Sequence, residues 1–285
     1  MTRVLDSAAV EKQGRALVAD RQGRSRVLSK LGGPAPMFVL SMIAMFGIWF
    51  ALSDVLKVPE YIIPHPNAVA VQFWESRSLL LGETWETTKA IMLAFGMAIA
   101  IGAPLGVVIA FSDIADRLLT PPLIVSQAIP KIALAPIFLA WFGFGVATNT
   151  AIGFVIAVFP IIINTVLGLK SIDPAMVRLG RAMSASSWRL FSKIRVPTAL
   201  PSLFAGLKIA GTFAVIGAIV GEFTAGVRGL GYLIAFSTGN LNMTLAFAAL
   251  VAISLVGIAV YFAIDLVERI ALRSYPTAQG LSAAI

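Results

Sequence analysis

The chain has 285 residues, of which 58% are hydrophobic and only 13% are charged, and its mean hydropathy is +0.90. A soluble domain is typically about half apolar and about a quarter charged, so this composition favours a protein whose second solvent is lipid. The net charge of +8 is compatible with nucleic-acid binding, but a membrane protein explains it equally well because Lys and Arg gather in cytoplasmic loops. We therefore expect a lipid bilayer and no nucleic acid as a partner.

The first 34 residues are predicted to form a basic tail. They contain seven Lys and Arg but no apolar stretch of the kind that a secretory signal peptide requires. We therefore expect residues 1–34 to precede the first span as a cytoplasmic tail and not to act as a cleaved leader.

Six stretches are long and apolar enough to cross a bilayer core, which needs about 20 residues of helix. They are residues 35–56, 88–111, 118–142, 147–169, 199–221 and 243–267. The third contains Pro121, Pro122, Pro130 and Pro136, so it is predicted to be kinked or partly unwound. The sequence thus predicts an all-α, polytopic membrane protein with six transmembrane helices.

The distribution of cations predicts that both chain ends lie in the cytoplasm. In that orientation sixteen Lys and Arg fall in cytoplasmic segments and four in external ones. The loop 57–87 is then external, and its residues 64–85 have the pattern of a short amphipathic helix on the outer surface. Residues 88–268 form a five-helix core that includes a cytoplasmic segment, 170–198, and residues 269–285 form a cytoplasmic tail.

Small residues recur in two of the predicted spans. Gly102 and Gly106 are four residues apart, as are Gly217 and Gly221. This spacing permits close packing of helices, although small residues are also common in any span.

Enzyme chemistry finds little support in the sequence. It contains no phosphate-binding loop, no His-Glu-x-x-His and no Gly-x-Ser-x-Gly pattern. The single histidine, His65, lies in a loop between two prolines, where we expect it to be solvated and not a ligand. Cysteine is absent, which excludes thiolate metal sites and a cysteine nucleophile. We expect no cofactor, no bound metal and no catalytic residue.

Residues 170–198 combine cations with aromatic and apolar side chains. Asp173-Pro174 is a typical helix start, since Asp caps exposed amides and Pro suits the first helical position. Apolar residues then recur at the spacing of one helix face: Met176, Leu179, Met183, Leu190 and Ile194. The run Ser-Ala-Ser-Ser at 184–187 predicts two short helices with a bend. The segment is either an interfacial helix among lipid headgroups or a docking element with Trp188 and Phe191 as anchors.

The spacing of this segment resembles a known signature. Permease subunits of binding-protein-dependent ABC importers (the MetI-like family) carry Glu-Ala-Ala-x3-Gly-x9-Ile-x-Leu-Pro between two late spans. Here Arg178, Leu179 and Gly180 stand at the Glu-Ala-Ala positions, Ser184 at the Gly, and Ile194, Val196 and Pro197 at Ile-x-Leu-Pro. Residues 128–145 ("AIPKIALAPIFLAWFGFG") and 221–234 ("GEFTAGVRGLGYLI") also resemble the branch that serves nitrate, sulfonate, taurine and pyrimidine precursors.

The resemblance implies a transport mechanism and a set of partners. Two permease copies would form the pore, two subunits of a separate ATPase would dock on residues 173–196, and an extracytoplasmic solute-binding protein would deliver substrate. A rigid turn through Pro197 and Pro201 would pass the movement into the fifth span. The residues assigned to ATPase coupling are Arg178, Leu179, Gly180, Ser184, Ala185, Trp188, Phe191, Ile194 and Pro197. The substrate would be a small anionic or zwitterionic solute, such as a sulfonate, taurine, nitrate or a pyrimidine-type compound.

Three ionisable residues lie within or at the ends of the spans. Lys131, near the middle of the third span, either helps anionic solutes through the pore or pairs with a carbonyl that a neighbouring proline frees. Lys208 is expected to extend toward the membrane interface. Glu222 either gates the outer mouth of the path or caps local amides. The candidate structural hinges are Pro130, Pro136 and Pro201.

A stand-alone ion-coupled carrier is the alternative function. Such carriers use carboxylates inside the membrane and inverted repeats. The spans of this chain contain almost no central Asp or Glu, since Glu222 and Asp265 lie near span ends. The sequence therefore favours an ATP-coupled permease in the cell (inner) membrane.

Overall fold

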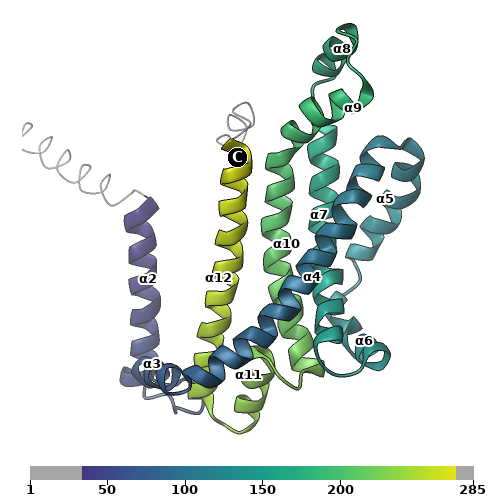
Figure 1. The fold of residues 1–285 in the computed structure, drawn as a ribbon. Helices are drawn as coiled ribbons and strands as arrows, with labels where there is room; N and C mark the ends of the chain where they lie inside the picture. Colours follow the sequence, from purple (N-terminus) through teal and green to yellow (C-terminus); the bar gives the residue numbers. More distant parts are fainter. Residues whose placement is uncertain (1–33, 274–285) are drawn as a thin grey trace, which may run out of the picture. The chain divides into compact units, whose positions relative to one another are not determined.

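A computed structural model describes residues 34–273, and these residues form helices joined by turns (Figure 1). This confirms the all-α prediction. The chain divides into two compact units, residues 1–66 and 67–285, which are described separately. Except for Pro34, the tail predicted at residues 1–34 lies outside the described residues. Of the C-terminal tail predicted at 269–285, residues 269–273 still belong to the last helix, Met243–Arg273, and the rest lies outside the described residues.

The first unit contains the first span. Helix α2 (Pro34–Phe50) continues into a π-helical turn, Ala51–Val55. The indole N–H of Trp49 donates to the Pro64 carbonyl at 3.0 Å. His65 was expected to be solvated, but its ring lies 3.2 Å from the Asp54 carboxylate and edge-on to Phe50. The loop after the span therefore folds back onto the end of its own helix.

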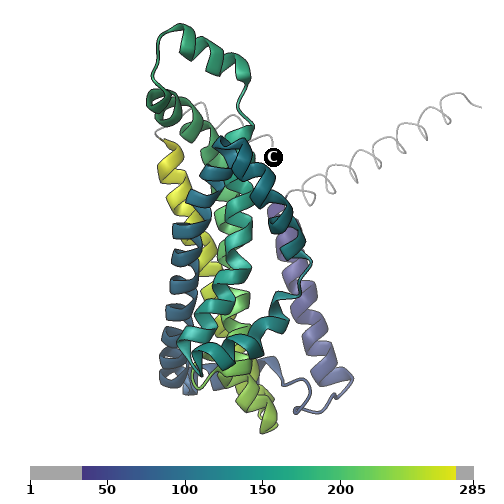
Figure 2. The ribbon, with the colours of Figure 1, turned by 90° about the vertical axis from the view of Figure 1, so that its right-hand side faces the viewer.

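The second unit is a bundle of long helices with short helices at both ends (Figures 1 and 2). In chain order it contains α3 (Pro66–Glu75, which begins at the unit boundary), α4 (Arg77–Phe111), α5 (Asp113–Gln127), a 3-10 turn (Lys131–Leu134), α6 (Ala135–Phe142), α7 (Val146–Lys170), α8 (Pro174–Ala182), α9 (Ser187–Leu190), a π-helical turn (Phe191–Arg195), α10 (Val196–Ala225), α11 (Leu230–Gly239) and α12 (Met243–Arg273). Helices α8 and α9 lie at one end of the bundle, and α6 and α11 lie at the other.

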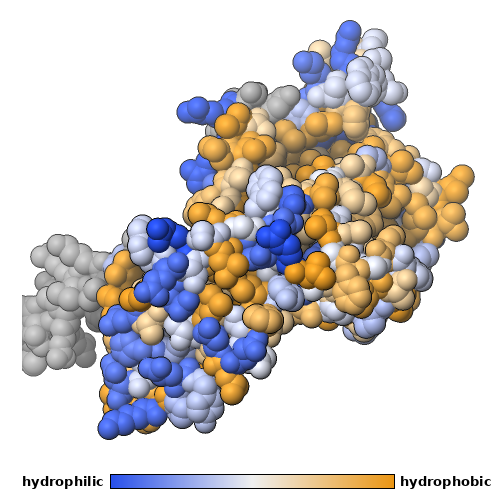
Figure 3. All heavy atoms as spheres, turned by 60° about the horizontal axis from the view of Figure 1, so that its bottom comes forward, coloured by the Kyte–Doolittle hydropathy of each residue, from blue (hydrophilic) through white to orange (hydrophobic). Residues whose placement is uncertain are grey.

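The described residues contain five helices that are long and apolar enough to cross a membrane, and a sixth if the bent pair α5–α6 counts as one span. All six predicted spans are therefore recovered. Large apolar side chains are exposed along these helices, and Figure 3 shows them over much of the surface. Helix α4 begins at Arg77, well before the predicted residue 88. Residues 77–87 are the half-buried start of the same helix, where the sequence suggested the end of a separate surface helix over 64–85 and the loop after it.

Glycines bring α4, α7 and α10 into close contact. A Cβ atom on Gly106 would lie 2.7 Å from the Thr165 Cβ, and one on Gly217 would lie 2.5 Å from the Cα of Gly153. A Cβ on Gly221 would lie 2.6 Å from the Cα of Asn149. The glycine spacings seen in the sequence therefore mark real helix contacts, in which the backbones approach closely without a side chain between them.

Candidate functional site

The segment after α7 folds into two short helices, as its sequence predicted. The Asp173 carboxylate accepts a hydrogen bond from the Ala175 N–H at 2.7 Å, and Pro174 takes the first position of α8. Ser184 has a φ of +58°, which turns the chain after α8. The Ser186 hydroxyl then accepts from the Arg189 N–H at 3.3 Å and caps α9. We call residues 173–195 the coupling hairpin.

The two helices of the coupling hairpin pack through a glycine. A Cβ on Gly180 would overlap the Cδ2 of Leu190, whose side chain is buried. Ile194 lies beside the same glycine. Leu190 and Ile194 therefore face inward, although the sequence spacing grouped them with three residues of α8 on one face. The turn at Ser184 breaks that periodicity.

Four large apolar side chains of the hairpin are exposed. Their exposed fractions lie between 51% and 75%, and we call this set the exposed ridge: Met176, Leu179, Met183 and Trp188. A cluster of large exposed apolar residues marks a surface that a partner or lipid covers. The ridge lies on the two short helices at the end of the bundle that Figure 1 labels α8 and α9.

The hairpin is tied to α4 by aromatic and cationic contacts. The Phe191 ring lies 5.5 Å from the ring of Phe111 at the end of α4, and the Arg195 guanidinium lies 4.6 Å above the Phe111 ring. Phe191, which the sequence suggested as an anchor for a partner, is thus partly engaged within the chain. Trp188, the other suggested anchor, is exposed.

The prolines after the hairpin do not produce the predicted turn. One continuous helical rod runs from Ser187 to Ala225 and passes through both Pro197 and Pro201. The π-helical turn before Pro197 absorbs the irregularity, because the Val196 N–H bonds the carbonyl of Phe191 five residues back. The hairpin is therefore joined to α10 by a continuous helix, where the sequence suggested a turn.

The third span is broken, as its prolines predicted. Helices α5 and α6 meet at an angle of 89°. Pro130 precedes the 3-10 turn, and Pro136 sits in the first turn of α6, where a helix tolerates it. Residues 127–130 at the break are exposed in the single chain. The Lys131 ammonium lies 4.7 Å from the centre of the Phe159 ring on α7.

Lys208 is held by two acids of a neighbouring helix. Its ammonium on α10 lies 2.6 Å from the Asp265 carboxylate and 2.5 Å from the Glu268 carboxylate, both on α12. No local pattern in the sequence indicates that α12 supplies two acids at this level, and the expectation that Lys208 extends toward the membrane interface stays a prediction.

Helix α11 is held at its N-terminus by side chains from two other helices. Its first amides are those of Gly229, Leu230 and Gly231. The Gly229 N–H donates to the Glu83 carboxylate at 2.5 Å. The Leu230 N–H donates to the Thr87 hydroxyl at 2.8 Å, and the Gly231 N–H donates to the Glu222 carboxylate at 2.7 Å. The Thr87 hydroxyl also donates to Glu222 at 3.0 Å. We call the three side chains Glu83, Thr87 and Glu222, with these amides, the α11 clamp.

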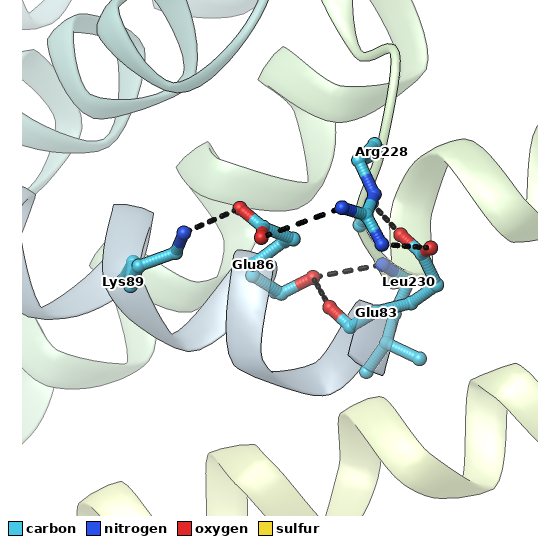
Figure 4. Close-up of polar contacts among 7 residues, drawn as sticks. Glu83, Glu86, Lys89, Arg228 and Leu230 are labelled. Atoms are coloured by element: carbon cyan, nitrogen blue, oxygen red, sulfur yellow. Dashed lines mark hydrogen bonds and ion pairs between the residues drawn. The ribbon is translucent and has the colours of Figure 1, made fainter. Parts of the chain in front are cut away.

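A surface ion-pair chain lies beside the clamp. Figure 4 shows Arg228 directed toward both Glu83 and Glu86 of α4, and Lys89 meeting Glu86 from one turn further along. The distances are 3.4 Å from Arg228 to Glu83, 3.9 Å from Arg228 to Glu86 and 2.7 Å from Lys89 to Glu86. Arg228 is well exposed, so these pairs add little to the buried contacts of the clamp.

The Gly-rich stretch after α10 is explained by the clamp. Gly229 has a φ of +111°, and a Cβ there would collide with the Glu222 carboxyl group. A Cβ on Gly231 would lie 2.9 Å from the Glu222 Oε2. Glu222 itself is only 1% exposed. Of the two roles suggested by the sequence, the contacts match the capping of local amides.

Glu83 and Thr87 were missed by the sequence analysis. They lie four residues apart, on one face of α4, at the end of the external segment 57–87, whose residues 64–85 were predicted to form a surface helix. The Glu-x3-Thr spacing is the only local signal for them, and their partners lie more than 130 residues later in the chain. Among the described residues, no cluster of three or more His, Cys, Asp and Glu could hold a metal ion.

Comparison with known proteins identifies the family. Residues 102–272, from the middle of α4 to the end of α12, match the family described as "Binding-protein-dependent transport system inner membrane component". The chain belongs to this family. This permease is therefore a multi-pass membrane subunit of the ABC importer class, as its sequence signature indicated.

Curated relatives cover most of the permease. It is 34% identical to the riboflavin transport system permease protein of Chloroflexus aurantiacus, over 88% of the permease and 94% of the relative. It is also 34% identical to the formylaminopyrimidine transport permease protein of Halalkalibacterium halodurans, over 84% and 94%. The putative aliphatic sulfonates transport permease protein of Escherichia coli is 28% identical, over 85% and 92%.

Solved structures share the fold. The methionine ABC transporter MetNI, in an inward-facing conformation, contains a chain that superposes with a TM-score of 0.59 and 22% identity. The match covers 68% of the permease and 97% of that chain. The helical arrangement around the core is thus that of the MetI-like permeases.

Proposed function

We propose that the permease forms the translocation path of an importer that is driven by a separate ATPase docking on the coupling hairpin. The observation that carries this proposal is the exposed ridge at the tip of a continuous helical rod. Interface hot spots are typically large apolar or aromatic side chains, and Trp188 and Leu179 fit that description. Because α9 continues into α10 as one helix, a push at Trp188 would move a transmembrane helix directly, and α8 packs on α9 through Gly180 and Leu190.

The charges around the ridge suit the cytoplasmic side. Arg178 and Arg181 of α8 and Arg189 and Lys193 beyond it are exposed around the hairpin. Cations concentrate on the cytoplasmic side of membrane proteins, and ATP is hydrolysed there. We therefore infer that the hairpin end of the bundle and both termini face the cytoplasm, that the α11 end faces outward, and that the protein lies in the cell (inner) membrane.

A second permease copy completes the path. Non-helical backbone at membrane depth is tolerated only where protein covers it or where it lines a water-filled cavity. Residues 127–130 at the break between α5 and α6 are exposed in the single chain, so lipid does not suit them. We infer a homodimer in which the two breaks face a common path, two ATPase subunits on the hairpins and a solute-binding protein at the outer end.

The solute is inferred to be a planar heterocycle of the pyrimidine or flavin type. The relatives named for riboflavin and formylaminopyrimidine are each 34% identical to the permease, whereas the one named for aliphatic sulfonates is 28% identical. Lys131, at the break and over the Phe159 ring, offers an ammonium group that would donate to a carbonyl oxygen of such a heterocycle.

Replacing Lys131 should weaken transport and leave ATP hydrolysis intact. In the reconstituted importer, we expect Lys131→Met to lower uptake of a radiolabelled formylaminopyrimidine about tenfold, since one charge-assisted hydrogen bond is lost. Lys131→Arg should keep most of the uptake because it keeps the charge.

The matched control is Lys89→Met, which removes a cation that pairs with Glu86 away from the break. If the Lys131→Met importer takes up substrate as fast as the Lys89→Met importer, Lys131 does not contribute to the translocation path. If the unmodified importer takes up a sulfonate and not the heterocycle, the proposed substrate class is wrong. The proposed function as an importer permease is then still supported.

A further inference from the structure

The α11 clamp joins three helices at the outer end of the bundle. Glu83 and Thr87 lie on α4, Glu222 lies on α10 three residues before its end, and the amides belong to the start of α11. All three side chains are buried, and Thr87 is fully so. The contacts converge on one point, because Thr87 accepts from α11 and donates to Glu222 of α10.

The clamp fixes the start of helix α11. This helix has only ten residues, is too short to cross the membrane, and packs against α12, α10 and α4. The chain leading into it, residues 226–229, contains two glycines and the extended backbone of Gly226, which gives it little stiffness of its own. The clamp therefore supplies the directional contacts that tie the first amides of α11 to α4 and α10.

The clamp is also the far end of the rod that begins at the coupling hairpin. Residues 187–225 form one helical unit, with Trp188 of the exposed ridge near one end and Glu222 near the other. A displacement of the rod would move the Glu222 carboxylate, and with it the amide of Gly231 and the hydroxyl of Thr87.

We propose that Glu83, Thr87 and Glu222 are positioning residues for transport, which make the start of α11 move as one body with the outer ends of α4 and α10. The proposal rests on the proposed function, because it assumes that an ATPase moves α10. The clamp converts a shift of the rod into a shift of α11 at the mouth that receives the solute. Without the clamp, the ATPase still hydrolyses ATP, but α11 no longer moves with α10.

Polar contacts suit this role better than an apolar contact would. Buried carboxylates at membrane level are unfavourable unless they are paired and hydrogen-bonded, and such residues usually serve function. Hydrogen bonds also fix direction, whereas apolar packing permits sliding. One carboxylate oxygen of Glu222, Oε1, is buried without a hydrogen-bond partner among the described residues, so the clamp is not built for stability alone.

The test uses Thr87→Val, which keeps the shape of the side chain and removes the bridging hydroxyl. In proteoliposomes with the ATPase and the binding protein, we expect uptake per ATP hydrolysed to fall about tenfold, because a buried amide and a carboxylate each lose a partner. ATP hydrolysis without binding protein should stay unchanged. Thr87→Ser restores the hydroxyl and should restore uptake.

Glu86→Gln is the matched control. It lies one residue from Thr87 and removes a charge, but Glu86 accepts no amide of α11 in the contacts described above. Its uptake per ATP should equal that of the unmodified permease. An equal loss in Glu86→Gln and Thr87→Val would overturn the proposal by showing that local charge or stability is responsible.

A distance measurement separates positioning from simple loss of folding. The chain has no cysteine, so spin labels can be attached at Trp85→Cys on α4 and Phe236→Cys on α11, both exposed sites. We expect one narrow distance distribution in the presence and absence of ATP, and a broad one when Thr87→Val is added. A narrow distribution in the Thr87→Val protein contradicts the proposal. If the unmodified permease shows no ATP-driven uptake at all, the proposed function is wrong. The distance measurement then still tests whether the clamp holds α11 in place.

Discussion

Gly217→Ala should destabilise the permease, because the added methyl group meets the backbone of a neighbouring helix. The new Cβ would lie 2.5 Å from the Cα of Gly153 and 3.2 Å from the Ile152 carbonyl oxygen, so it would meet backbone that cannot rotate away. Helices α7 and α10 would have to separate along their contact. We expect a loss of about 1–3 kcal/mol or more and a fall of about 5 °C in the midpoint of thermal unfolding in detergent.

The same substitution at an open position provides the control. Gly96 lies on α4, and a Cβ there would meet nothing within 4 Å. Gly96→Ala should leave the unfolding midpoint unchanged or slightly higher, since alanine favours helix by about 1 kcal/mol over glycine. Equal midpoints for the two variants would mean that α7 and α10 do not pack as closely as described.

Trp188→Ala and Leu179→Ala should each release the ATPase. Both side chains are exposed, at 73% and 62%, and lie on the ridge at the tip of the rod. Hot-spot residues contribute about 2 kcal/mol or more to an interface, so affinity should fall about thirtyfold for each. Copurification with a tagged ATPase from detergent extracts measures this loss, and ATP-dependent uptake should fall with it.

Trp85→Ala is the matched control for this experiment. Trp85 is a similarly exposed tryptophan, at 63%, on the part of α4 inferred to face outward. It should copurify the ATPase as well as the unmodified permease does. If Trp188→Ala and Leu179→Ala also retain the ATPase in full, the ridge is not the docking surface, and an interfacial role in lipid headgroups becomes the better interpretation.

The sequence predicted the spans because hydropathy is a local property. Each of the six predicted stretches corresponds to a helix or to the bent pair, and the prolines correctly marked the third as broken. The helix start at Asp173-Pro174 and the turn within 184–187 were also predicted correctly, since capping and turn chemistry depend on neighbouring residues.

What the sequence did not reveal depends on contacts between distant segments. The α11 clamp joins residues 83 and 229, and no local pattern connects them. The pairing of Lys208 with two acids of α12 was hidden for the same reason. The predicted turn at Pro197 and Pro201 was wrong because a π-helical turn one step earlier accommodates the proline, and that turn has no sequence signature.

ATP-dependent uptake by the purified permease in proteoliposomes tests the central claim most directly. With the ATPase and the solute-binding protein present, uptake of the heterocycle should require ATP, and Trp188→Ala should abolish it. The permease alone should show no uptake driven by a proton or sodium gradient. Uptake by the permease alone under such a gradient, unchanged by Trp188→Ala, would contradict the account and identify an ion-coupled carrier.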